Sequence, residues 1–157
     1  MTTSNMISRY GLRCVLFVGL LMSLLVGCNQ TLEEYQFTLE GTIESGQGAG
    51  ESGTINVELY YQESGEGTLK QPLLLFQSFT LDAFGSFSQS IIYPVTSDRK
   101  GLIVYAWVDQ NKDGSLCTTE QRDEGSALVV VEGFPKRTVN VKLKLENLCQ
   151  GPEAFYP

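Results

Sequence analysis

The residues with the most specific chemistry lie in one stretch, residues 109–120, whose sequence is DQNKDGSLCTTE. Oxygen-bearing side chains recur at its first, third and fifth positions, glycine is sixth, and glutamate is twelfth. This spacing is the pattern of a calcium-binding loop. Ca²⁺ takes about six to eight oxygen ligands, so the chain must wrap around it, and the glycine permits the sharp turn required. The pattern predicts five calcium ligands: the side chains of Asp109, Asn111, Asp113 and Glu120, and the backbone carbonyl of Ser115.

Two questions about this loop stay open from the sequence. Aspartate and asparagine side chains also accept hydrogen bonds from nearby backbone amides, so the same residues could shape a surface loop without an ion. The last ligand is also open, because a strand rather than a helix precedes the loop, and Asp123 or Glu124 could replace Glu120. Without the ion, Asp109, Asp113 and Glu120 would repel one another, and the loop should loosen.

The first 27 residues have the features of an export signal rather than of a folded domain. Two arginines form a positive region, and an uncharged, mostly apolar segment, residues 14–25, follows it. This segment is shorter than the roughly 20 residues that a helix needs to span a bilayer. The sequence therefore predicts a signal peptide over residues 1–27.

The end of this segment, Leu25-Val26-Gly27-Cys28, resembles the lipobox of bacterial lipoproteins. The resemblance implies cleavage after Gly27 and attachment of a diacylglyceryl thioether and further acyl chains, such as palmitate, to Cys28. Each methylene buried in the bilayer contributes about 0.8 kcal/mol, so such an anchor holds firmly. Asn29, which is not aspartate, implies the outer membrane in a Gram-negative host. An ordinary secretory signal with an unmodified Cys28 is the alternative.

The charge of the chain excludes some classes of partner. The formal net charge is −7, and removal of the signal would leave nine basic and eighteen acidic residues. An acidic domain repels phosphate backbones and anionic lipid headgroups, which argues against nucleic acid as a partner. We expect the membrane contact to be the lipid anchor on Cys28, with envelope proteins or glycans as the candidate partners.

Two cysteines, Cys117 and Cys149, remain in the predicted domain. Export places them in an oxidising compartment, which favours a disulfide between the calcium loop and the end of the last strand. Closing this span of 32 residues would stabilise the fold by about 3–4 kcal/mol in the chain-entropy model. Two separate thiols are the alternative. A zinc site is not expected, because two cysteines without histidine give too few ligands.

Alternating apolar and polar residues predict short strands throughout the rest of the chain. Residues 102–108 are almost wholly apolar and indicate a central strand, and the apolar run Leu73–Phe76 predicts burial on both faces of its strand. The sequence predicts a single antiparallel β-sandwich of about seven strands, transthyretin-like or immunoglobulin-like. The expected layout is a signal peptide (1–27), a lipidated N-terminus and tether (28–34), the sandwich (35–149) and a tail (150–157). The predicted strands are 35–43, 55–61, 73–81, 86–93, 102–108, 128–131 and 138–146.

Three segments add a family resemblance. Residues 81–88, LDAFGSFS, are similar to the D-x-x-G-x-F turn of transthyretin-like (carboxypeptidase regulatory-like) modules. Residues 104–114 look like the strand and EF-hand-type calcium loop of small exported bacterial sandwiches, and residues 138–143 match the usual last strand. The resemblance implies the fold and the position of the loop, and it implies no activity.

The sequence gives little support for catalysis. It contains no histidine, which removes the commonest general base and the usual serine or cysteine triads. Carboxylates are numerous, but no spacing marks a pair that would flank a substrate bond. We therefore expect no enzyme, and an envelope hydrolase ranks last among the functions considered.

The expected function is that of a membrane-anchored, calcium-stabilised β-sandwich that serves as a structural or interaction module of the cell envelope. The alternative is a lipoprotein that binds carbohydrate or peptide on an aromatic face. Tyr105 and Trp107 lie two residues apart, hence on one face of a strand, and with Tyr60 and Tyr61 they could form such a platform. Burial in the core is the other interpretation, and it is favoured because sandwich cores commonly contain these residues.

Overall fold

The computed structural model describes residues 34–46, 50, 52–63, 73–95, 99–117, 122 and 124–152. The chain divides into two compact units, Met1–Thr31 and Leu32–Pro157, and every described residue belongs to the second. The predicted signal segment, Cys28, Glu120, Asp123 and the end of the tail lie outside the described residues. Within the described part of the chain, no helix is both long and apolar enough to cross a membrane.

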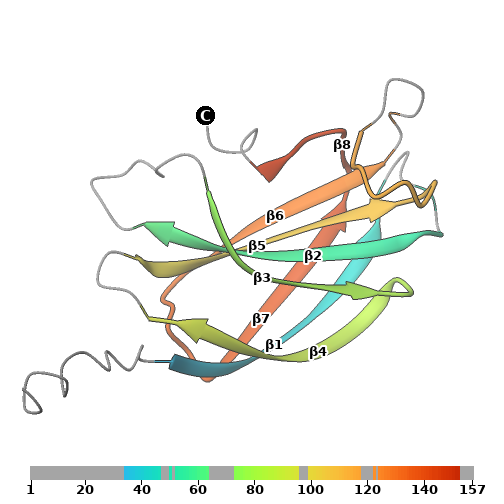
Figure 1. Cartoon of the computed structure of the whole chain (residues 1–157). Helices are drawn as coiled ribbons and strands as arrows, with labels where there is room; N and C mark the ends of the chain where they lie inside the picture. Colours follow the sequence, from blue (N-terminus) through green and yellow to red (C-terminus); the bar gives the residue numbers. More distant parts are fainter. Residues whose placement is uncertain are drawn as a thin grey trace, which may run out of the picture. The chain divides into compact units, whose positions relative to one another are not determined.

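Two sheets pack as a β-sandwich, which confirms the predicted all-β class (Figure 1). One sheet has three strands in the order β4-β1-β7, and the other has five in the order β3-β2-β5-β6-β8. The seven predicted strands are all present, and the two-residue strand β8 adds to them. The strands are β1 (Glu34–Ser45), β2 (Thr54–Glu63), β3 (Leu74–Leu81), β4 (Gly85–Pro94), β5 (Arg99–Asp109), β6 (Gly125–Val131), β7 (Thr138–Leu145) and β8 (Asn147–Leu148).

One strand pair departs from the antiparallel pattern that the sequence predicts. β1 pairs antiparallel with β4 but parallel with β7, with Thr38 opposite Thr138 and Ser45 opposite Leu145. A parallel pair needs a connection that crosses over, and here strands β2 to β6 form it, four of them in the other sheet. Alternation along a strand reports which side chains are buried, but not the direction of the neighbouring strand.

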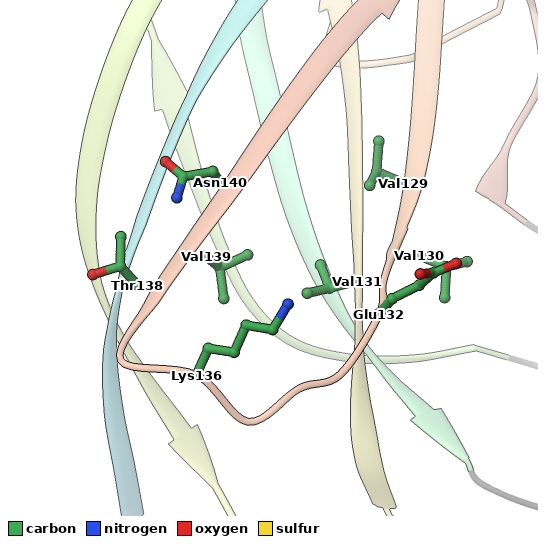
Figure 2. Close-up of a pocket in the computed structure, with 8 residues that line it drawn as sticks. All are labelled: Val129, Val130, Val131, Glu132, Lys136, Thr138, Val139 and Asn140. Carbon is green, nitrogen blue, oxygen red and sulfur yellow. The ribbon is translucent and has the colours of Figure 1, made fainter.

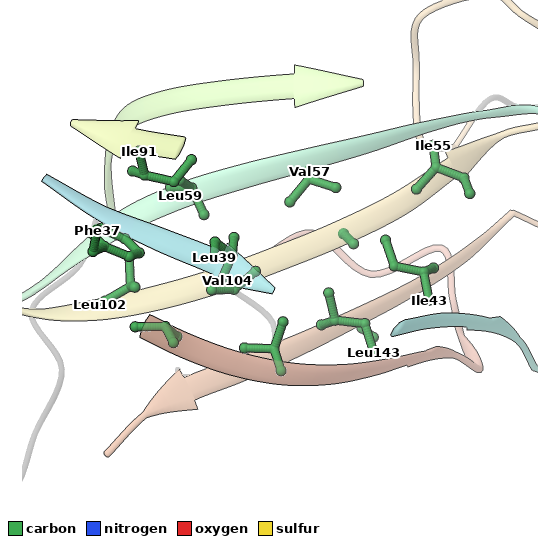
Figure 3. Packing of buried hydrophobic residues seen from close by; sticks show 14 of the residues in the cluster. Phe37, Leu39, Ile43, Ile55, Val57, Leu59, Ile91, Leu102, Val104 and Leu143 are labelled. Carbon is green, nitrogen blue, oxygen red and sulfur yellow. The ribbon is translucent and has the colours of Figure 1, made fainter. Parts of the chain in front are cut away.

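The main core lies between the two sheets and follows the alternation seen in the sequence (Figure 3). On β7, Val139, Val141, Leu143 and Leu145 are buried, and the residues between them are exposed. The even-numbered residues of β5, from Leu102 to Val108, face the same core. Each fully buried aliphatic side chain contributes about 1.5–3 kcal/mol, so this interior is the main source of stability.

The expectation that Leu73–Phe76 would be buried on both faces holds only in part. β3 is an edge strand of the five-stranded sheet, and it begins at Leu74. Leu75 is 52% exposed, while Leu74 and Phe76 are only partly buried and pack against the main core. Leu73, which precedes the strand, is buried with Tyr60 and Ile103 on the opposite face of the sheet, so the run is partly buried on both faces of an edge strand.

Candidate metal centre

The loop that follows β5 begins at a buried position. Asp109 is the last residue of β5 and is only 6% exposed. It pairs with Thr54 at the start of β2, and a Cβ atom on Gly53 would lie 2.6 Å from the carbonyl oxygen of Asp109. Glycine is therefore required where β2 begins, because any side chain would push the two strands apart. This close packing fixes Asp109 at the rim of the sheet.

Residues 109–115 form the turn that the calcium pattern predicts. The backbone N–H groups of Asp113 and Gly114 donate to the two carboxylate oxygens of Asp109, at 3.2 and 3.0 Å. Gly114 has φ 76°, the left-handed conformation that glycine adopts without strain. The amide oxygen of Asn111 accepts from the N–H of Asp113 at 2.9 Å, and Asp113 accepts from the N–H of Ser115 at 2.7 Å. These hydrogen bonds shape the loop with or without an ion.

Glu124 is the residue that gives the loop a ligand-binding character. The carboxylates of Glu124, Asp109 and Asp113 each offer one oxygen, and these three oxygens lie within 4.8 Å of one another. Two oxygens on opposite sides of one Ca²⁺ are separated by about 4.6–5.2 Å, twice the usual metal–oxygen distance. The spacing therefore allows one cation to be held by the three carboxylates.

The side chain of Glu124 is fully buried and only half satisfied. Its Oε1 atom accepts a hydrogen bond from the N–H of Gln110 at 3.2 Å. Among the described residues, its Oε2 atom is the one buried side-chain nitrogen or oxygen atom that has no hydrogen-bond partner. A buried carboxylate oxygen without a partner costs about 1–3 kcal/mol or more, so its position beside two further carboxylates calls for a cation.

Backbone contacts with β8 and with the residue that follows it hold Glu124 in place. The N–H of Cys149 donates to the carbonyl oxygen of Glu124 at 3.1 Å, and Gly125 pairs with Leu148 of β8. The buried hydroxyl of Ser126 donates to the carbonyl oxygen of Asn147 at 2.7 Å. The carboxylate thus projects from a strand whose start is fixed on both sides, by β5 and by β8.

The electrostatics of the cluster are those of uncompensated negative charge. Burial raises the pKa of Glu124 above its usual range, and the charges of Asp109 and Asp113 raise it further; hydrogen bonds from the backbone of Gln110 and Asn111 oppose this rise. In the described part of the chain, no lysine or arginine forms an ion pair with any of the three carboxylates. A bound divalent cation would supply the missing positive charge.

The structure brings together only part of the predicted ligand set. Asp109 and Asp113 converge, and the amide nitrogen of Asn111 donates to Asp113 Oδ2 at 2.7 Å. Ser115 is exposed, and Glu120 lies outside the described residues. Glu124, one of the two alternatives, occupies the place where a further ligand is needed. Its sequence signal is its position directly before the apolar strand β6, which anchors it.

Cys117 and Cys149 are both free thiols, and they lie side by side. Cys117 is exposed as a residue, yet loss of solvent around its sulfur and a hydrogen bond with the Cys149 side chain raise the pKa of Cys117 to about 12. The negative charge of Glu124 acts in the same direction, which places this thiol pair close to the carboxylates. The predicted pairing partners are thus neighbours, and the disulfide itself stays a prediction.

The two aromatic residues considered as a ligand platform are buried. Tyr105 is 1% and Trp107 is 8% exposed, and both pack with Tyr60 in a second cluster on the face of the five-stranded sheet opposite the main core. The indole N–H of Trp107 donates to Glu58 at 3.1 Å, and the hydroxyl of Tyr105 donates to the carbonyl oxygen of Gln150. A sugar or peptide could stack on these rings only after the groups that bury them had moved.

A separate hollow of about 350 Å³ lies between β6 and β7 (Figure 2). Val129 and Val131 of β6 and Val139 of β7 line it, and the side chain of Lys136 extends along it. Glu132 and Lys136 are the only charged groups in its lining, and neither belongs to the carboxylate cluster. The lining lacks the convergent polar groups of a ligand site, so we place the candidate site at the carboxylates.

Comparison with known proteins gives a distant structural match and no family. No protein-family model matches the chain. No curated protein matches it either. Among solved structures, the chain is similar to a candidate cell adhesion protein from Bacteroides eggerthii, with 14% sequence identity and a TM-score of 0.33. The match covers 75% of this chain and 41% of that one, so this chain corresponds to less than half of its structural neighbour.

Proposed function

We propose that this chain is a calcium-stabilised β-sandwich, anchored by lipid to the cell envelope, where it serves as a structural or interaction module. The single observation that carries the calcium clause is the Oε2 atom of Glu124, which is buried, has no hydrogen-bond partner among the described residues and lies beside Asp109 and Asp113. A fold with an uncompensated carboxylate at this point gains stability from a cation, and the loop sequence selects Ca²⁺.

The choice of Ca²⁺ over other ions follows from the donor atoms. All three converging groups are carboxylates, which are hard oxygen ligands suited to Ca²⁺ or Mg²⁺ rather than to zinc or copper. Mg²⁺ demands near-ideal octahedral geometry and keeps most of its water, whereas Ca²⁺ accepts irregular shells. A loop that supplies several ligands from alternate residues therefore favours Ca²⁺.

The ion would act by joining two neighbouring strands at one end of the five-stranded sheet. Asp109 is the last residue of β5 and Glu124 directly precedes β6, and these strands pair from Leu102–Val131 to Trp107–Ser126. A cation between the two carboxylates closes the connection where the backbone pairing ends. The stabilised loop would then present a defined surface at this rim, which suits a module that contacts other envelope components.

The anchor clause rests on the sequence Leu25-Val26-Gly27-Cys28 and on its resemblance to a lipobox. We expect the protein to reach the cell envelope, and the outer membrane if the host is Gram-negative. Labelling cells with a radioactive palmitate analogue should mark the wild-type chain, and Cys28→Ser should remove the label. A Cys14→Ser variant is the matched control, and a label that survives Cys28→Ser would refute the anchor.

The proposal includes no catalytic step. The expected role is to hold and present a surface, because the sequence contains no histidine, the commonest general base. Envelope proteins or glycans remain the proposed partners of that surface.

Calcium titration of the folded protein tests the central clause. Extracellular calcium modules bind at about 10⁻⁴–10⁻³ M, so 10 mM Ca²⁺ should stabilise the fold by about 1.4–2.7 kcal/mol. This corresponds to a rise in Tm of roughly 4–10 °C for a domain of this size. Mg²⁺ at the same concentration is the control and should give a smaller rise. An unchanged Tm in 10 mM Ca²⁺ relative to chelator would remove calcium from the proposal.

A further inference from the structure

Two cysteines that are distant in sequence meet beside the carboxylate cluster. Cys117 lies in the loop after β5, Cys149 directly follows β8, and their side chains share a hydrogen bond. Both are free thiols in this structure. The other two cysteines of the sequence, Cys14 and Cys28, lie outside the described residues.

Each cysteine is attached to a different half of the metal site. Cys117 stands two residues after Ser115, in the loop whose hydrogen bonds are organised by Asp109 and Asp113. Cys149 donates its N–H to the carbonyl oxygen of Glu124 at 3.1 Å. Its backbone has φ 51°, a left-handed conformation that is uncommon for a residue with a side chain and that the surrounding structure must hold. The cysteine pair thus spans the gap between the first carboxylates and the last one.

We propose that Cys117 and Cys149 form a disulfide that cross-links the two halves of the metal site, so that oxidation of the pair and binding of Ca²⁺ favour each other. This inference rests on the proposed calcium function and adds a covalent partner to the same site. It assigns a structural reason to the position of both thiols, next to the residue that completes the carboxylate cluster.

The covalent step is an ordinary thiol–disulfide exchange. One thiolate of the pair attacks a disulfide oxidant, such as oxidised glutathione, and forms a mixed disulfide while one glutathione leaves as a thiol. The second cysteine then attacks the mixed disulfide and releases the second glutathione. The protein loses two electrons and two protons in total, and the oxidant gains them as two thiols.

The coupling follows from geometry. The disulfide and the ion both hold the loop of Asp109 and Asp113 against the strand start that carries Glu124. When one restraint is already in place, the other therefore loses less conformational entropy in ordering that arrangement. Because linkage between two binding events is reciprocal, the factor by which the disulfide strengthens calcium binding equals the factor by which calcium favours the disulfide.

Redox titration of the full-length chain in mild detergent measures this factor. The protein is equilibrated in glutathione buffers with 5 mM Ca²⁺ or with chelator, then quenched, alkylated and digested with trypsin. The bridge is read as the linked peptides Asp113–Arg122 and Leu145–Pro157. We expect Ca²⁺ to raise the ratio [GSH]²/[GSSG] at half-reduction by about tenfold, within the usual range of coupling between sites.

Calorimetry with Ca²⁺ gives the reciprocal measurement. The oxidised chain should bind about tenfold more tightly than the chain reduced with dithiothreitol. The double variant Cys117→Ser, Cys149→Ser should bind Ca²⁺ with the affinity of the reduced chain, and dithiothreitol should not change that affinity. A Cys14→Ser variant is the matched control and should behave like the wild type in every titration.

The outcomes separate this inference from the function on which it rests. Absence of the linked peptides at every glutathione ratio would overturn the disulfide. Linked peptides with the same midpoint in Ca²⁺ and in chelator, together with measurable calcium binding, would overturn the coupling and leave the calcium function standing. No calcium binding in either redox form would overturn both.

Discussion

Two acidic side chains at the solvent face of the three-stranded sheet, Glu44 and Glu146, meet lysines, whereas those at the end of β5 meet one another. Glu44 lies 2.9 Å from Lys142, and Glu146 lies 2.7 Å from Lys144, with all four side chains exposed to solvent. Asp109, Asp113 and Glu124 converge without such partners among the described residues, and two of them are buried. The exposed ion pairs thus contribute little to the stability of the sandwich. The buried carboxylates have no compensating charge, so a cation bound there would contribute much more.

Replacing Asp109 should give the largest effect in this comparison. Asp109→Ala removes one ligand and the acceptor of two backbone N–H groups. We expect a loss of about 2–4 kcal/mol of unfolding free energy in the presence of Ca²⁺, measured by urea denaturation. Glu44→Ala, on the exposed face, is the control. If Asp109→Ala leaves the urea midpoint unchanged, the carboxylate does not organise the loop.

Replacing Glu124 should have opposite effects with and without the ion. Glu124→Gln removes a buried charge that has no cationic partner, so in chelator the variant should be more stable than the wild type by about 1–2 kcal/mol. In Ca²⁺ the wild type should regain the advantage, because the variant has lost a charged ligand. Urea denaturation in both conditions gives the two differences. A variant that is weaker in chelator and still responds to Ca²⁺ would contradict the assignment.

The same residue predicts the pH dependence of the calcium-free protein. The pKa of Glu124 is raised in the folded state, so the folded protein binds this proton more tightly than the unfolded chain does. Its contribution is fully present below the unfolded value and is lost as pH rises through the folded value. Unfolding free energy should therefore fall as the pH rises from about 4.5 towards neutral.

Urea midpoints across this pH range, after calcium removal on a chelating resin, check that fall. Saturating Ca²⁺ should reduce this fall in unfolding free energy, because the ion takes the place of the proton on Glu124. The Glu124→Gln variant should not show the fall. An equal slope in wild type and variant would assign the pH dependence to other groups.

The smallest effect should come from the paired acids. Glu44→Gln breaks an ion pair in which both side chains are well exposed, so the free energy of unfolding should change by about 0–0.5 kcal/mol. The change should be the same in Ca²⁺ and in chelator. A loss above about 1 kcal/mol would show that the exposed pairs also stabilise the sandwich, and the contrast between the two regions would weaken.

Much of the fold was predictable because each strand is half buried. The alternation along β7 and the apolar run of β5 identify both strands and their inward faces directly from the residue types. Strand direction and edge position were not predictable in this way. The parallel partner of β1 and the exposed edge at Leu75 depend on how distant segments assemble, and no local pattern records that.

The candidate site shows the same division. The spacing of Asp109, Asn111 and Asp113 predicts the turn, because those three residues act within one loop and the turn is local. Glu124 could be named only as an alternative, because its place depends on pairing with β8, a strand of two residues without a periodic signal. The contact between the Cys117 and Cys149 thiols has the same origin, since the turn after β8 brings the second cysteine back.

Because β1 lies between β4 and β7, the first strand of the domain completes its pairing only with the last long one. Thr38 meets Thr138, so during synthesis β1 must remain unpaired on one side until nearly the whole domain has followed. Contacts of such large sequence separation slow folding, since the loop must close before the pairing stabilises it. Until β7 arrives, β1 therefore presents an open hydrogen-bonding edge, and an unpaired edge of this kind can pair with another chain and promote aggregation.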